Sequence, residues 1–136
     1  MKTIILTALI FGIISCNSSK DVNNSKATQE LFDSYSIVSI AGVESLATFP
    51  TMKFDFKLNK VSGNAGCNDY GGTMILEGNK IKFSEFRATE MYCDNMSIEQ
   101  KFLSKLAKVD YFKVEKSQLE MYNQSDELLL VFETDN

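Results

Sequence analysis

The sequence contains no histidine, so it lacks the side chain that most often acts as an acid or base near neutral pH. It therefore has no Ser-His-Asp arrangement and no zinc site built from histidine and cysteine ligands. The 18 acidic residues are scattered along the chain and single out no pair of catalytic carboxylates. Because no group of residues specifies a reaction, a metal or a cofactor, we expect a protein that is not an enzyme.

Clusters of positive charge are also absent. Arg87 is the only arginine, and most lysines stand singly along a chain of net charge −4. Nucleic acids and anionic membranes are bound by clustered cations, so we expect no nucleic-acid partner and no polybasic membrane patch. Pro50 is the only proline, and 44% of the residues are hydrophobic, which is typical of a globular chain rather than a disordered one.

The chain begins with a targeting segment. A basic start precedes an apolar run over residues 3–14, which as a helix would reach about 18 Å, short of a bilayer core of about 30 Å. The run is therefore predicted to be a signal peptide. Its end, Ile13-Ile14-Ser15-Cys16, resembles the bacterial lipobox, which implies a lipoprotein signal at residues 1–15 and a lipid on Cys16. The alternative is an ordinary signal with a coincidental cysteine.

The segment after Cys16 is polar and has no hydrophobic periodicity, so residues 16–32 are predicted to be the lipidated cysteine and a flexible tether. Residues 33–136 have the length of one folded domain. The lipid on Cys16 would anchor this domain to a membrane. We expect a protein of the bacterial cell envelope, held at the outer membrane, with another envelope protein as its partner.

Two cysteines remain for the domain, Cys67 and Cys93. Disulfides form and persist in the envelope, and a domain of about 100 residues benefits from one, so we expect these cysteines to be joined. Closing the loop between them would contribute about 3.5 kcal/mol in the chain-entropy model. The alternative is a reactive thiol, which needs an activating base or cation nearby.

Residues 62–72 are the most unusual stretch, with four glycines and two asparagines. This composition implies positions of positive φ or close backbone approaches. No Lys-Ser or Lys-Thr pair follows, as a phosphate-binding loop requires, and the spaced carboxylates of a calcium loop are absent. We predict a structural turn or bulge that positions Cys67. The candidate functional loop within it consists of Gly66, Asn68, Asp69 and Tyr70.

Strands are predicted where apolar and polar residues alternate or where β-branched and aromatic residues gather. These segments are residues 35–40, 52–58, 74–76, 80–83, 111–114, 119–122 and 128–132. Glu77-Gly78-Asn79 predicts a hairpin turn, and residues 84–95 are predicted to be irregular. The last segment is apolar without alternation, which favours a strand covered on both faces.

One helix is predicted near residues 97–108. Ser97 and Gln100 fit a capping box, and the apolar residues of this segment share one helical face. The helix is therefore expected to cover a sheet. This helix, together with six to eight strands, predicts an antiparallel α+β domain.

A pattern of spaced residues runs through the domain. It consists of Tyr35, Gly66-Cys67-Asn68, Tyr70, Gly72, Thr89, Met91, Cys93, Glu99, Phe102 and Leu106. The pattern resembles the META/HslJ domain family of bacterial envelope proteins over about residues 33–133, with Tyr35 where the family usually has tryptophan. The resemblance implies a strongly curved antiparallel sheet, close to a half-open barrel, with the helix packed across it. It implies no catalytic residues and no cofactor, and an association with heat shock, envelope stress and antibiotic sensitivity.

Three functions remain open. We expect a lipid-anchored, non-catalytic envelope protein that binds another envelope component, in connection with stress. One alternative is a carrier that encloses a small apolar ligand, lined by Phe54, Phe56, Ile81, Phe83, Met121 and the last strand. The other is an enzyme of unknown type that uses Asp69, Tyr70 and Arg87.

Overall fold

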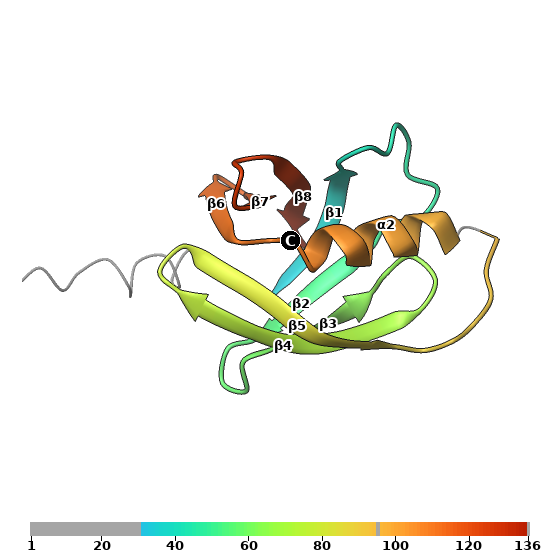
Figure 1. Cartoon of the computed structure of the whole chain (residues 1–136), viewed down its shortest axis with the longest axis horizontal. Coiled ribbons are helices and arrows are strands. Elements are labelled where there is room, and N and C mark those ends of the chain that lie inside the picture. Colours follow the sequence, from blue (N-terminus) through green and yellow to red (C-terminus); the bar gives the residue numbers. More distant parts are fainter. Residues whose placement is uncertain (1–30, 95, 136) are drawn as a thin grey trace, which may run out of the picture.

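The computed structural model describes residues 31–94 and 96–135. The predicted signal peptide, Cys16 and nearly all of the predicted tether lie outside the described residues. Within these ranges the chain forms eight β-strands and one α-helix (Figure 1). They are β1 (Ser34–Ile40), β2 (Thr51–Asp55), β3 (Lys60–Asn64), β4 (Asp69–Glu77), β5 (Lys80–Ala88), α2 (Met96–Leu106), β6 (Tyr111–Glu115), β7 (Gln118–Tyr122) and β8 (Leu128–Thr134).

The sheet curves into a ring, because each strand pairs antiparallel with the next and β8 returns to pair with β1. The contact between β5 and β6 is short: Lys80 opposite Tyr111 is the single register pair in the described chain. The ring is therefore not a regular barrel. The expected α+β fold with a strongly curved antiparallel sheet is confirmed.

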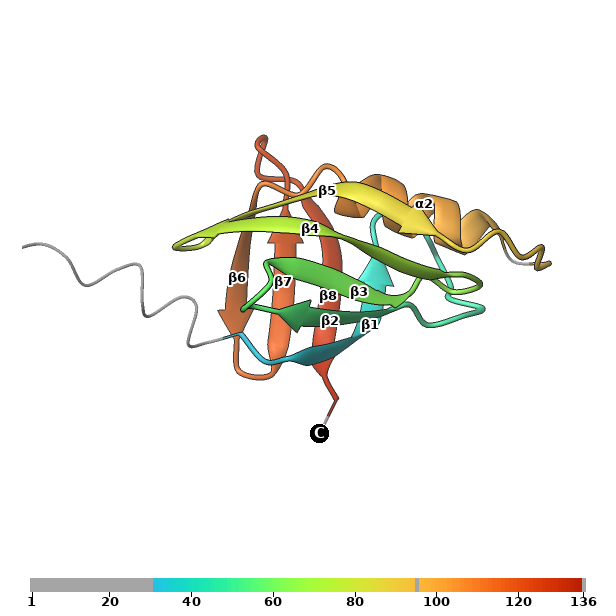
Figure 2. The same ribbon diagram turned by 90° about the horizontal axis from the view of Figure 1, so that it is seen from below.

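Helix α2 packs across the ring against β8 and β1 (Figure 2). Its buried residues Ile98, Phe102 and Leu106 are spaced by four residues, so they lie on one face. The ring of Phe102 meets that of Phe132 edge to face, with centroids 6.2 Å apart. The expectation that the helix covers a sheet is confirmed.

The helix expected near residues 97–108 is confirmed, and its observed ends differ from the expected ones by one or two residues. The helix begins at Met96, so Ser97 lies inside the first turn and does not cap it. It ends at Leu106 instead of Lys108. After Leu106 the N–H of Lys108 donates to the Lys105 carbonyl at 2.9 Å, and this tighter turn stops the α-helical pattern.

Aromatic side chains fill the interior of the ring. Tyr35 is fully buried, and its hydroxyl accepts a hydrogen bond from the N–H of Phe32 at 2.9 Å. The Tyr35 ring meets Phe54 and Phe132 edge to face, with centroid distances of 6.0 and 6.4 Å. Tyr35 thus occupies the core position that the family resemblance gives to an aromatic residue.

The side chains expected to line a ligand cavity take part in the same packing. The ring of Phe54 stacks on Phe56 and Phe83, with centroids 5.4 and 6.4 Å apart. Ile81 and Met121 are fully buried in the core. Phe54, Ile81, Phe83 and Met121 thus belong to the packed core, while Phe54 and Phe56 also line an open surface pocket of about 510 Å³.

Strand β2 is shorter than its alternation predicts. It ends at Asp55, where the side-chain Oδ1 accepts hydrogen bonds from the N–H groups of Lys57 and Leu58, both at 3.0 Å. Asn59 follows with φ at 53°, in the left-handed region. An aspartate that bonds to the backbone ahead of it favours a turn, so the alternation continued past the true end of the strand.

The turn predicted to position Cys67 is present at residues 65–68, between the paired strands β3 and β4. One further prediction needs correction in β5. Residues 84–88 were expected to be irregular, yet β5 extends to Ala88. The register between β4 and β5 shifts by one residue near Glu85, whose φ is 54°. Such a bulge lets the strand continue through a sequence that does not alternate.

The last strand is not covered on both faces. Leu128 is 39% exposed, and the register between β7 and β8 shifts by one residue next to it, so Leu129 is an extra residue in β8. Leu129 and Leu130 are both buried. The bulge explains two consecutive buried positions without a second covering layer.

Two glycines, one in β3 and one in β4, allow the close packing of neighbouring strands to be tested. A Cβ at Gly63 would collide with the Thr51 carbonyl oxygen, whereas a Cβ at Gly71 would meet nothing nearer than the Val61 carbonyl at 3.8 Å. We expect Gly63→Ala to lower the free energy of unfolding by about 3 kcal/mol. Gly71→Ala should raise it by about 0.5 kcal/mol, because alanine restricts the unfolded chain. Denaturant unfolding measures both, and equal stabilities would contradict the close approach at Gly63.

Candidate functional site

Three connections lie together at one end of the ring. Consecutive strands are antiparallel, so β1, β3 and β5 all run in one direction and end here (Figure 2). The start of β1 lies at the opposite end of the ring. The connections that follow these strands are residues 41–50, 65–68 and 89–94. The first packs on the second, since a Cβ at Gly66 would lie 2.6 Å from Thr48 Oγ1. We call these three connections the loop end.

The turn at residues 65–68 is held by the side chain of Asn64. Its Oδ1 accepts a hydrogen bond from the N–H of Gly66 at 2.9 Å, and its Nδ2 donates to the Asp69 carboxylate at 3.0 Å. Gly66 has φ at 111°, a conformation that residues with a side chain rarely adopt. The Ala65 N–H donates to the Asn68 carbonyl at 2.8 Å and closes the turn.

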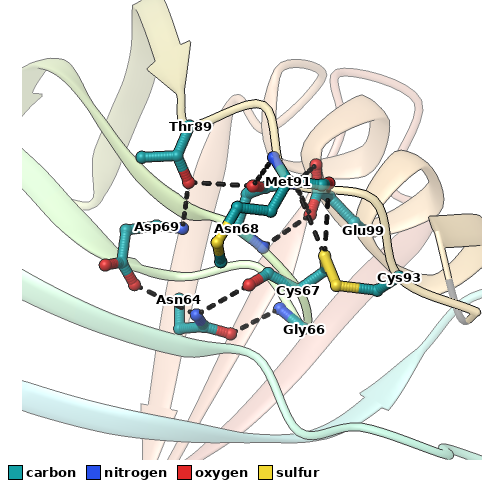
Figure 3. The surroundings of a disulfide bond; sticks show 9 residues. All are labelled: Asn64, Gly66, Cys67, Asn68, Asp69, Thr89, Met91, Cys93 and Glu99. Carbon is teal, nitrogen blue, oxygen red and sulfur yellow. Dashed lines mark hydrogen bonds between the residues drawn. A yellow bond between two sulfur atoms is a disulfide. The ribbon is translucent and has the colours of Figure 1, made fainter.

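Asn68 joins this turn to the 89–94 connection (Figure 3). Its side-chain Oδ1 accepts hydrogen bonds from the N–H of Met91 at 2.7 Å and from the hydroxyl of Thr89 at 2.8 Å. Its Nδ2 donates to the Met91 carbonyl at 3.1 Å. The amide thus satisfies both backbone groups of Met91, as a neighbouring strand would, and fixes the path of the connection.

Glu99 joins the same residue to helix α2. Its carboxylate accepts hydrogen bonds from the backbone N–H of Asn68 at 2.8 Å and from Asn68 Nδ2 at 3.1 Å (Figure 3). Asn68 is 1% and Glu99 6% exposed. A carboxylate is rarely buried to this degree, and burial is costly unless donors surround it. Asn68 supplies these donors, so the two residues depend on each other.

The position of Glu99 in the sequence indicates a buried role for its carboxylate. Glu99 precedes Phe102 and Leu106 by three and seven positions, which places it on the apolar face of the helix. A charged residue on such a face needs a buried partner. The sequence does not identify that partner, which lies 31 residues earlier in the chain.

Cys67 and Cys93 form a disulfide, as expected, with their Cα atoms 6.0 Å apart. The bridge lies beside the hydrogen bonds of Asn68 (Figure 3). It joins the 65–68 turn to the 89–94 connection, the same two segments that Asn68 links. A covalent bond and a set of hydrogen bonds therefore hold the same two segments together.

The structure separates the residues of the predicted functional loop. Gly66 and Asn68 lie in the turn, where they serve its geometry. Asp69 is exposed at the start of β4, while Tyr70 is buried and its hydroxyl donates to the Thr51 carbonyl at 3.1 Å. Burial raises the pKa of Tyr70. Neighbouring residues in a strand point to opposite faces, so Asp69 and Tyr70 do not form one site.

Arg87, the third residue of the enzyme alternative, lies on β5 opposite Gly71. It lines an open surface groove of about 670 Å³ together with Lys60 and Glu85, and neither Asp69 nor Tyr70 lines this groove. The structure therefore does not gather the three residues. In the described ranges there is also no group of three or more Cys, Asp or Glu side chains placed to hold a metal ion. No helix of the described chain combines the length and the apolar character needed to cross a membrane.

Two apolar side chains of the 89–94 connection are exposed to solvent. Met91 is 60% and Tyr92 89% exposed, although both backbone groups of Met91 are hydrogen-bonded. The buried polar network and the disulfide therefore hold a loop whose side chains are free to contact another molecule.

The mutual dependence of Asn68 and Glu99 can be tested by stability measurements. Asn68→Ala should lower the free energy of unfolding by about 3 kcal/mol, because it leaves the Met91 N–H and part of a carboxylate unpaired. Glu99→Gln should cost about 1.5 kcal/mol, since one buried acceptor is lost. The exposed Glu90→Gln is the control and should change stability by less than about 0.5 kcal/mol. Denaturant unfolding would contradict the network if Asn68→Ala behaved like the control.

A second measurement separates the disulfide from the hydrogen bonds. Replacing both cysteines (Cys67→Ala with Cys93→Ala) should lower the free energy of unfolding by about 3.5 kcal/mol, because the unfolded chain regains the conformational entropy of the open loop. The Met91 N–H should nevertheless stay protected from hydrogen exchange, because Asn68 still binds it. In Asn68→Ala, with the disulfide intact, this protection should be lost. Rapid exchange of Met91 in the cysteine variant would show that the disulfide alone fixes the loop.

Comparisons with known proteins agree with this architecture. An NMR structure of a protein from Burkholderia xenovorans is 23% identical with a TM-score of 0.64, over 94% of this chain and 99% of that chain. A second protein solved by NMR is 20% identical with a TM-score of 0.57, over 75% of this chain and 88% of its own. At these identities the likeness shows the fold. No match to the sequence is found among curated proteins. A family model described as META domain matches residues 29–136, so the chain belongs to the META domain family.

Proposed function

We propose that this protein is a lipid-anchored, non-catalytic component of the bacterial cell envelope, held at the outer membrane, whose META domain binds another envelope component. The anchor is argued from the resemblance of residues 13–16 to the lipobox. Two acyl chains give a stable membrane anchor, whereas one binds reversibly. The proposed link to envelope stress or heat shock follows from the family resemblance.

The binding function is argued from the hydrogen bonds that the buried polar groups make. A catalytic site keeps polar groups free for a substrate, but the amide of Asn68 and the carboxylate of Glu99 bond to each other and to the protein backbone. The network therefore acts as a support. It supports a loop that presents Met91 and Tyr92 to solvent.

The anchor is tested by fractionating cells of the native host. Cys16→Ala should move the protein from the membrane fraction to the soluble fraction, and mass analysis of the wild type should find Cys16 acylated at the mature N-terminus. The matched control carries Cys67→Ala and Cys93→Ala, and it should stay in the membrane. An unacylated wild-type N-terminus, or a Cys16→Ala variant that remains in the membrane, would overturn the proposed anchoring.

A further inference from the structure

Eight large hydrophobic side chains of the described chain are exposed to solvent. Three of them lie on the loop end: Tyr92 is 89%, Phe49 65% and Met91 60% exposed. Phe49 belongs to the 41–50 connection, whose Thr48 packs against Gly66 in the central turn. The side chains thus come from the two connections that flank the 65–68 turn.

The backbone of the 89–94 connection is held by hydrogen bonds and by the disulfide. Met91 is bonded through both its N–H and its carbonyl, and the disulfide fixes Cys93 two residues later. Binding through a fixed loop avoids the entropy cost of ordering it, and large exposed aromatic side chains dominate the energy of protein interfaces. The loop end therefore has the features of a preformed docking surface for a protein.

Acidic side chains outnumber basic ones around this surface. The carboxylates of Glu44, Asp69, Glu90 and Asp94 are exposed on the loop end or next to it. The two ion pairs of the described chain lie elsewhere, between Lys82 and Asp110 and between Lys105 and Glu127. Two cations lie nearby: the Nζ of Lys101 donates to the Gly42 carbonyl at 3.2 Å, and Arg87 lines the groove on the outer surface.

The direction of the strands separates this surface from the proposed anchor. β1 starts at one end of the ring, where the tether would join, and the loop end lies at the other (Figure 2). The tether would therefore attach away from the loop end and leave this surface free to contact a protein.

We propose that the loop end docks a protein partner that has an apolar pocket for Tyr92 and a basic rim facing Glu44, Asp69, Glu90 and Asp94. This inference rests on the proposed binding function and names the surface and the chemistry of the partner. Rim charges chiefly set the rate of association and its salt dependence, whereas a central aromatic residue sets the rate of dissociation.

The first test is photo-crosslinking of the full-length protein in cells of its native host. A benzophenone amino acid is placed at position 92 or, as the matched control, at position 75. Ile75 is 62% exposed on β4, away from the loop end. We expect one dominant protein adduct from position 92 that is absent from position 75.

The captured protein is then purified and its binding to the full chain measured. Tyr92→Ala should weaken binding at least about tenfold, mainly through faster dissociation. Glu90→Gln combined with Asp94→Asn should slow association and reduce its dependence on salt. Ile75→Ala should leave both rates unchanged.

The failures of the two proposals are distinguishable. A protein adduct from position 75 but not from position 92 would overturn the docking surface and leave the binding function standing. Lipid adducts from position 92 would overturn it as well, since the loop end would then face the membrane. Binding that is insensitive to salt and to Glu90→Gln with Asp94→Asn would overturn the basic rim. The absence of protein adducts at either position would count against both proposals.

Discussion

The hydrogen bonds between Asn68 and Glu99 organise one whole end of this domain. A buried carboxylate needs donors, and a buried amide needs partners on both its oxygen and its nitrogen. Each residue satisfies the other, and the atoms left over bind the backbone of Met91. Helix α2, the 65–68 turn and the 89–94 connection are therefore placed by one pair of side chains.

The strands were predictable where burial alone decides the pattern. The segments at residues 35–40, 111–114 and 119–122 were close to the observed β1, β6 and β7, because one face of each packs on the core. The end of β2 was not predictable from alternation, since the bonds of Asp55 to the next turn interrupt the strand. The bulges at Glu85 and Leu129 depend on the register with a neighbouring strand, which a single strand does not encode.

The site was predictable only in its covalent part. The predicted export and the cysteine count together indicated the joining of Cys67 and Cys93, and the glycine-rich stretch indicated a turn beside them. The network around Asn68 was not predictable, because its members come from segments 21 to 31 residues apart. Asp69 and Tyr70 were grouped by their proximity along the chain. The strand that contains them turns one outward and the other inward, and this separates them.

The pairing of the first and last strands affects how the domain forms. The hydroxyl of Ser36 on β1 bonds to the carboxylate of Asp135, 99 residues later, and β8 fills the space between β1 and β7. Contacts between distant segments form slowly, because the intervening chain must first be brought together. An emerging chain that still lacks β8 has two unpaired strand edges and a helix without its main support. Ring closure therefore waits for the final residues, and until then the unpaired edges of β1 and β7 are open to pairing with other chains.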